Sequence, residues 1–164
     1  MILYIVRHAI AAPCRPGVSD KDRELTEEGI AKMKKAAAGL AAMAAIPDVI
    51  LSSPLSRARQ TAEILMAAFS DRPRLKVIPS LAPQGNRAEL YEEIRSHQSH
   101  DGVMLVGHEP LLSDLTCEIL SGSPGCFLTL KKGGACAIDI AKMSPAPSGF
   151  LRWLIPPAIL RELG

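Results

Sequence analysis

Two short apolar runs without a single charged residue constrain the fold of this chain more than any other feature. They occupy residues 2–6 and 103–106, and a run that is apolar at every position predicts a strand buried on both faces. Strands of that kind occur in parallel sheets, where a helix usually connects one strand to the next. We therefore expect strands to alternate with helices and a sheet that is covered on both faces.

The remaining segments fit this alternation. Thr26 predicts the N-cap of a helix that runs to about Ala45, before Pro47. Further helices are expected over 53–69, over 86–98, and from Pro110 to the turn at 121–125. Further strands are expected over 48–51, 75–78, 135–140 and 150–155, the last of them at a sheet edge. The prediction is a three-layer α/β/α fold with a mostly parallel central sheet, built by residues 1–164 as a single domain.

Composition and charge exclude several classes of protein. The chain has 164 residues, 48% of them hydrophobic and 22% charged, which is the balance of a soluble globular protein with one core. The formal net charge is +2, and no basic stripe is present, so binding to nucleic acid is not expected. No stretch approaches the roughly 18 apolar residues of a transmembrane helix, so no membrane association is expected.

The N-terminus and the cysteines predict the compartment. The apolar run at 2–6 has no basic region before it and ends at Arg7, so we expect no secretory signal. The cysteines form no CxxC pair, which argues against a zinc site. We expect reduced, mostly buried thiols and a cytoplasmic protein; the four cysteines are Cys14, Cys117, Cys126 and Cys136.

Polar side chains follow three of the expected strands, at the edge where parallel sheets bind ligands. Arg7 and His8 follow the first strand, Arg57 lies at the start of the helix after the second, and His108 follows the fourth within Gly107-His108-Glu109-Pro110. Alone, each arginine would ordinarily be a surface ion-pair partner and each histidine a satisfied polar group. Together they would place guanidiniums, imidazoles and helix N-termini on one rim. Such a rim favours a compact dianion, of which phosphate is the obvious candidate.

These motifs resemble those of the histidine phosphatase superfamily, whose better-known members include cofactor-dependent phosphoglycerate mutase. The resemblance lies in three motifs: Arg7-His8-Ala9, Ser53-Pro54 with Arg57-Ala58 and Gln60-Thr61-Ala62, and 106–110. The short chain and segments 23–26 and 81–86 are similar to the SixA branch, which removes phosphate from phosphohistidine on histidine phosphotransfer domains. The resemblance implies a phosphoglycerate mutase-like fold.

The resemblance also implies a role for each site residue. His8 would attack phosphorus and form a covalent phosphohistidine, which water then hydrolyses. Arg7, Arg57 and His108 would clamp the phosphoryl oxygens and stabilise the transition state. Arg23 would be a further phosphate-binding residue. No metal or cofactor is implied, because the arginines supply the positive charge. Neighbouring cations should keep the imidazole of His8 neutral and nucleophilic at pH 7.

Two departures from the family pattern bear on the site and its substrate. Ala9 stands where the family usually has glycine, and a positive φ there would be strained. The added methyl is small, so we expect the site to accommodate it. The stretch 79–86, after the third strand, has no carboxylic acid to protonate a leaving alkoxide. Cleavage of phosphohistidine needs less help from an acid. When its other ring nitrogen is protonated, the leaving group is a neutral imidazole. We therefore expect a phosphohistidine-bearing protein, such as a histidine phosphotransfer domain, as the substrate.

Two alternatives stay open. One is a phosphatase of a small phosphorylated metabolite with the same fold and nucleophile, using Glu89 or Glu109 as the acid. The other is a phosphate-binding protein without turnover, although the intact set of site residues argues against it.

Overall fold

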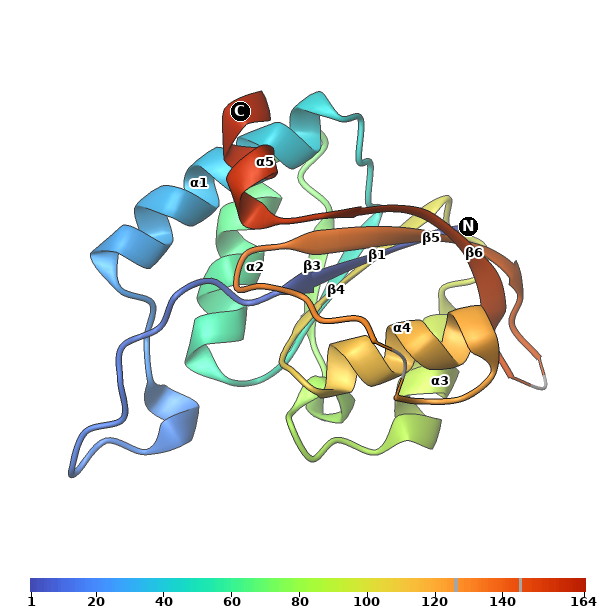
Figure 1. The fold of residues 1–164 in the computed structure, drawn as a ribbon, viewed down its shortest axis with the longest axis horizontal. Helices are drawn as coiled ribbons and strands as arrows, with labels where there is room; N and C mark the ends of the chain where they lie inside the picture. The colour runs from blue at the N-terminus through green and yellow to red at the C-terminus, as the bar shows by residue number, and fades with distance from the viewer. Residues whose placement is uncertain (126, 145) are drawn as a thin grey trace.

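A six-stranded mixed sheet forms the centre of the computed structural model, which describes residues 1–125, 127–144 and 146–164 (Figure 1). The strand order is β3-β2-β4-β1-β5-β6. The first four of these strands run parallel to one another. Strand β5 pairs antiparallel with β1, and β6 pairs antiparallel with β5. Their bounds are β1 Ile2–Arg7, β2 Val49–Ser52, β3 Arg74–Val77, β4 Gly102–Gly107, β5 Ala135–Lys142 and β6 Ser148–Ile155. The predicted α/β fold with a mostly parallel sheet is confirmed, and β6 lies at one edge of the sheet, with β3 at the other.

Helices cover both faces of the sheet, as the buried strands predict (Figure 1). Tyr4 and Val6 of β1 pack into one core with α1, α2 and α5. Leu3 and Ile5 point to the other core, with α3 and α4. The alternation of β1 side chains between two apolar cores explains why the run at 2–6 has no polar position. The helices are α1 Glu27–Ala42, α2 Ser56–Ala68, α3 Arg87–Ser96, α4 Leu111–Ser121 and α5 Pro157–Leu163, with 3-10 turns η1 Asp20–Asp22 and η2 Pro79–Leu81.

Two helix boundaries differ from the prediction. Helix α1 ends at Ala42 because Ala44 adopts a left-handed conformation, φ 55°, which turns the chain and buries Ala45. Helix α2 begins at Ser56, three residues later than expected. Ser53 is not its N-cap, and its hydroxyl is engaged in the site described below.

Helix α5 is absent from the sequence prediction, in which Pro156-Pro157 indicates only the end of the last strand. Pro157 instead occupies the first turn of the helix, where a missing N–H costs nothing. Helices α1 and α5 pack closely: a Cβ on Gly39 would lie 1.9 Å from the Leu160 carbonyl oxygen. This contact holds α5 against α1, beside the carboxyl end of β1.

The cysteines also differ from the prediction. Cys117 on α4 is disulfide-bonded, so the expectation of reduced thiols is wrong for this residue. Cys14 is free and exposed, and Cys136 is free and buried; Cys126 lies outside the described residues. Within the described ranges, no helix is both long and apolar enough to cross a bilayer.

Candidate active site

The register of the sheet brings the two site histidines together. Arg7 of β1 pairs with Gly107 of β4, so His8 and His108 follow neighbouring strand ends. The main-chain N–H of His8 donates to the Gly107 carbonyl at 3.0 Å. The two imidazole rings lie with centroids 5.0 Å apart, and both are almost fully buried. His8 and His108 therefore meet at one edge of the sheet, as expected for residues that follow neighbouring parallel strands.

A hydrogen bond to the backbone selects the tautomer of His8. Its Nδ1 lies 2.7 Å from the carbonyl oxygen of Ala9. A carbonyl only accepts, so Nδ1 carries the hydrogen, and Nε2 of the neutral ring keeps its lone pair. Nε2 is thus the ring nitrogen with a free lone pair, which is the form that a nucleophilic imidazole requires.

The surroundings of His8 keep its ring neutral. Burial is the largest influence on the pKa of His8, the hydrogen bond to Ala9 opposes it, and the charges of Arg57, Arg7 and Lys132 add to it. Together they lower the pKa from 6.5 to about 4. The charged form loses hydration on burial and is repelled by the neighbouring cations. At neutral pH the ring is therefore available for attack without a separate base.

The pKa shift predicts a measurable titration. In uniformly ¹⁵N-labelled protein, the ring nitrogens of His8 should titrate with a midpoint near pH 4, assigned by their absence in His8→Ala. A midpoint near 6.5 would contradict the buried, cation-surrounded ring. Because the unfolded chain takes up this proton near pH 6.5 and the folded chain near 4, acidification through that window should also lower the free energy of unfolding.

His108 is held by Ser53, which follows β2. The His108 Nε2 lies 2.8 Å from Ser53 Oγ, and that oxygen also accepts from the Leu55 N–H at 3.3 Å. When the Ser53 hydroxyl donates to Nε2, the proton of the neutral His108 ring is on Nδ1. Burial first, then the charges of His8 and Arg57, lower the pKa of His108 to about 3. Sequence reasoning included Ser53 in a motif but missed this contact.

The two predicted phosphate-binding arginines reach the same region from different elements. Arg57, the second residue of α2, is 5% exposed, and Arg7 ends β1. One Arg7 N–H donates to the Leu130 carbonyl at 2.7 Å. Both arginines lower the pKa of both His8 and His108, so all four groups share one electrostatic environment.

Three buried nitrogen atoms of this group have no hydrogen-bond partner among the described residues. They are Arg7 Nε, Arg57 Nε and His108 Nδ1. An unpaired buried donor costs about 1–3 kcal/mol, and more when charged. Donors from three separate segments that converge on a neutral imidazole suit one kind of guest, an oxyanion with several acceptor oxygens.

Asp20 joins Arg23 to this group, and sequence reasoning did not single it out. Its carboxylate accepts from Arg57 Nη2 at 3.1 Å and from Arg23 Nε at 2.8 Å, while its carbonyl accepts from Arg57 Nη1 at 2.7 Å. The hydrogen bond from Arg23, and then Arg57, holds the Asp20 pKa below its ordinary value. Arg23 is therefore connected to Arg57 and the site through the carboxylate of Asp20. The sequence signal for this contact was the i, i+3 spacing of Asp20 and Arg23.

The backbone accommodates Ala9 without a positive φ. The described non-glycine residues with positive φ are Ala44 and Arg72, so Ala9 does not need the freedom of glycine. Its N–H donates to Thr61 Oγ1 at 3.1 Å, and the Thr61 hydroxyl donates to the Arg57 carbonyl at 2.6 Å. This chain of bonds ties the segment after β1 to helix α2, and with it His8 to Arg57.

The two candidate acids have other positions. Glu89 is exposed on the first turn of α3. Glu109 accepts main-chain N–H groups with both oxygens, from Leu130 at 2.9 Å and from Ser113 at 3.4 Å. These bonds fasten the start of α4 to the segment before β5. Glu109 is thus occupied in a structural role.

Comparisons with known proteins agree with this geometry. The sequence pattern of the histidine phosphatase superfamily (branch 1) matches residues 3–82. An uncharacterized protein of Picosynechococcus sp. is 39% identical over 136 residues, covering 82% of each chain. The phosphohistidine phosphatase SixA of Escherichia coli is 27% identical over 98% of this chain and 97% of its own. This chain belongs to the histidine phosphatase superfamily.

Solved structures place it in the SixA-like branch. The structure of the protein histidine phosphatase SixA complexed with tungstate superposes with a TM-score of 0.83 at 25% identity, covering 98% of this chain and 99% of that one. The alpha-ribazole phosphatase of Shigella flexneri shares the fold, with a TM-score of 0.71 at 19% identity over 96% and 97% of the chains. Membership of this superfamily supports phosphatase activity for the chain.

Proposed function

We propose that this protein removes the phosphoryl group from phosphohistidine on another protein, through a covalent phosphohistidine on His8. The observation that carries the proposal is the set of three unpartnered buried donors beside a neutral imidazole. Tungstate, which the SixA structure contains, is a tetrahedral oxyanion like phosphate and supports the same kind of guest. The cavity chemistry thus fits a phosphoryl group, with Arg7, Arg57, His108 and Arg23 as its binding residues.

The first chemical step transfers phosphorus from one imidazole to another. His8 Nε2 forms a bond to phosphorus while the phosphorus–nitrogen bond of the substrate breaks. Substrate phosphohistidine that carries a proton on its other nitrogen leaves as neutral imidazole, so no protein acid is required. Arg7, Arg57 and His108 stabilise the charge on the three equatorial oxygens.

The second step releases phosphate. Water attacks phosphorus, the bond to His8 Nε2 breaks, and the product is dihydrogen phosphate, which loses a proton to solvent according to pH. The His8 ring keeps its Nδ1 hydrogen throughout, because the Ala9 carbonyl holds it. The ring therefore leaves as neutral imidazole and returns to its starting tautomer.

The acids in the structure favour a phosphorus–nitrogen substrate over a phosphate ester. An ester needs a proton for its alkoxide, and Glu109 is held by main-chain N–H groups while Glu89 is exposed. The 79–86 segment forms the η2 turn and ends at Asn86, the N-cap of α3, without a carboxylate. The proposed partner is a protein such as a histidine phosphotransfer domain. We also propose a cytoplasmic location, although the disulfide at Cys117 is evidence against it.

A substrate comparison tests the proposal. With EDTA present, the protein should dephosphorylate a phosphohistidine-bearing phosphotransfer domain with a kcat/KM at least about 100-fold above that for phosphate monoesters, because the monoesters lack an acid for their leaving group. The comparison monoesters are p-nitrophenyl phosphate, 3-phosphoglycerate and glucose 6-phosphate. Faster cleavage of a metabolite ester, with phosphohistidine untouched, would contradict the proposal and assign a small-molecule substrate. Loss of activity in EDTA would contradict metal independence.

A further inference from the structure

A groove with a basic rim begins beside the candidate active site. It has a volume of about 430 Å³ and lies between the end of β1, helix α1, the turn before β5 and helix α5. Arg7 and Ala9 line its end next to His8. We call it the basic groove and define its rim by the five cations Arg7, Lys32, Lys131, Lys132 and Arg161.

The turn that carries two of these cations is fastened to the catalytic strand. Gly133 has φ +75°, a conformation that favours glycine, and its N–H donates to the carbonyls of Arg7 and His8 at 3.0 and 3.3 Å. The Gly134 N–H closes the turn on the Lys131 carbonyl at 2.7 Å. Lys132 lowers the pKa of His8, so the charge of this turn reaches the nucleophile.

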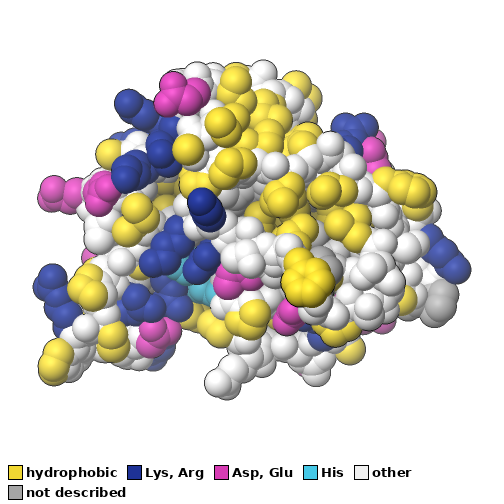
Figure 2. All heavy atoms as spheres, viewed as in Figure 1, with side chains coloured by type: hydrophobic (Ala, Val, Ile, Leu, Met, Phe, Trp, Pro, Cys, Tyr) yellow, Lys and Arg dark blue, Asp and Glu magenta, His cyan; other side chains and the backbone are white. Residues whose placement is uncertain are grey.

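The charge of the groove is mostly uncompensated. No Asp or Glu lines it, and Lys32 alone of its three lysines forms an ion pair, with Glu28, among the described residues. Arg161 has no acidic partner within those ranges either. The whole chain has a net charge of only +2, so five cations around one groove are a local concentration. Figure 2 shows Lys and Arg side chains gathered on this face beside the histidine surface and extending toward α1.

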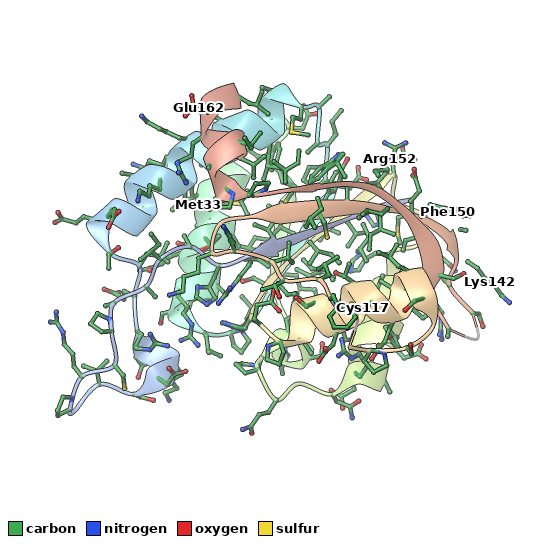
Figure 3. All side chains as sticks on the ribbon, viewed as in Figure 1. Met33, Cys117, Lys142, Phe150, Arg152 and Glu162 are labelled. Carbon is green, nitrogen blue, oxygen red and sulfur yellow. The ribbon has the colours of Figure 1, made fainter. Side chains whose placement is uncertain are left out.

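The floor of the groove is apolar. Met33 and Ala36 of α1 and Pro157 of α5 line it, and Figure 3 shows Met33 where these two helices meet. A cationic rim over an apolar floor is complementary to a protein segment that carries both acidic and apolar side chains. A small dianion would use the rim and leave the floor uncovered.

We propose that the basic groove docks an acidic surface segment of the protein whose phosphohistidine enters the site. This inference rests on the proposed function and specifies the partner. The groove shares Arg7 and Ala9 with the site, so a segment adjacent to the phosphohistidine can occupy it during transfer. Complementary charge would raise the rate of encounter and select partners with an acidic surface.

Two phosphohistidine peptides test the docking. They share one sequence, except that four residues on one side of the phosphohistidine are glutamate in the first and glutamine in the second. For the wild-type protein at low salt, kcat/KM should be about tenfold or more higher for the glutamate peptide. The preference should shrink as salt is raised from about 20 to about 500 mM, because ions screen the attraction.

Charge reversal in the groove gives the decisive variant. The double variant Lys131→Glu, Arg161→Glu should lose the glutamate preference while its kcat/KM for the glutamine peptide stays within about twofold, since neither side chain contacts the phosphoryl site. The matched control Lys142→Glu, Arg74→Glu changes net charge equally at exposed positions. It should keep the preference, because Lys142 lies at the far end of the sheet from Met33 (Figure 3).

The outcomes separate the docking inference from the proposed function. Equal kcat/KM for both peptides with wild type, or equal loss of preference in the control variant, would overturn docking while dephosphorylation of both peptides upheld the function. No dephosphorylation of either peptide or of the phosphotransfer domain would overturn the function itself. Inhibition by inorganic pyrophosphate that depends on Lys131 and Arg161, without a glutamate preference, would instead assign the groove to a small anion and overturn the inference.

Discussion

Replacing His8 with alanine is expected to lower kcat for phosphohistidine hydrolysis by about 10⁴-fold or more. The variant lacks Nε2, which is the only atom proposed to bond phosphorus, and water must then attack the substrate directly. The arginines would still bind the phosphoryl group, so affinity for inorganic phosphate should persist.

The fold should survive this substitution, because the main-chain bond from residue 8 to the Gly107 carbonyl does not involve the side chain. Rapid acid-free quenching after mixing with ³²P-labelled substrate should reveal labelled wild-type protein, stable in alkali and labile in acid, and no label on His8→Ala. His97→Ala is the matched control, since His97 caps α3 and pairs with Glu93. Substantial turnover in His8→Ala would end the covalent mechanism.

Replacing Arg57 with alanine is expected to lower kcat/KM by about 10²–10³-fold. The guanidinium is almost fully buried, and its Nε is one of the three unpartnered donors. Its loss removes stabilisation of the transferring phosphoryl group and raises the inhibition constant of tungstate. It also leaves the Asp20 carboxylate paired with Arg23 alone, so that this carboxylate would repel an incoming dianion more strongly.

Two further variants separate these effects. Arg57→Lys keeps the charge but cannot form the two bonds to Asp20, so its activity should lie between wild type and Arg57→Ala. Arg95→Ala removes a partly exposed arginine that pairs with Glu92 and should leave kcat/KM within about twofold. Wild-type kinetics in Arg57→Ala would mean that this guanidinium does not contact the phosphoryl group.

The layout of the site follows from local patterns in the sequence. The uncharged runs at 2–6 and 103–106 specify buried parallel strands, because only a strand covered on both faces needs an apolar residue at every position. Parallel strands end at one edge, so whatever follows them meets there. The positions of Arg7, His8 and His108 could therefore be predicted from the sequence alone. The local apolar pattern determines where the strands lie, and the parallel arrangement brings their carboxyl ends to one edge.

Contacts between distant segments depend on the tertiary structure. Asp20 meets Arg57 across 37 residues and Ser53 meets His108 across 55, and no periodicity encodes such pairs. Helix α5 could not be predicted from the sequence, because Pro156-Pro157 both ends a strand and begins a helix. The basic groove could not be recognised without α5 and the Gly133 turn. The neutrality of His8 likewise depends on burial and on cations from several elements. Both act through space, so they cannot be read from the order of residues along the chain.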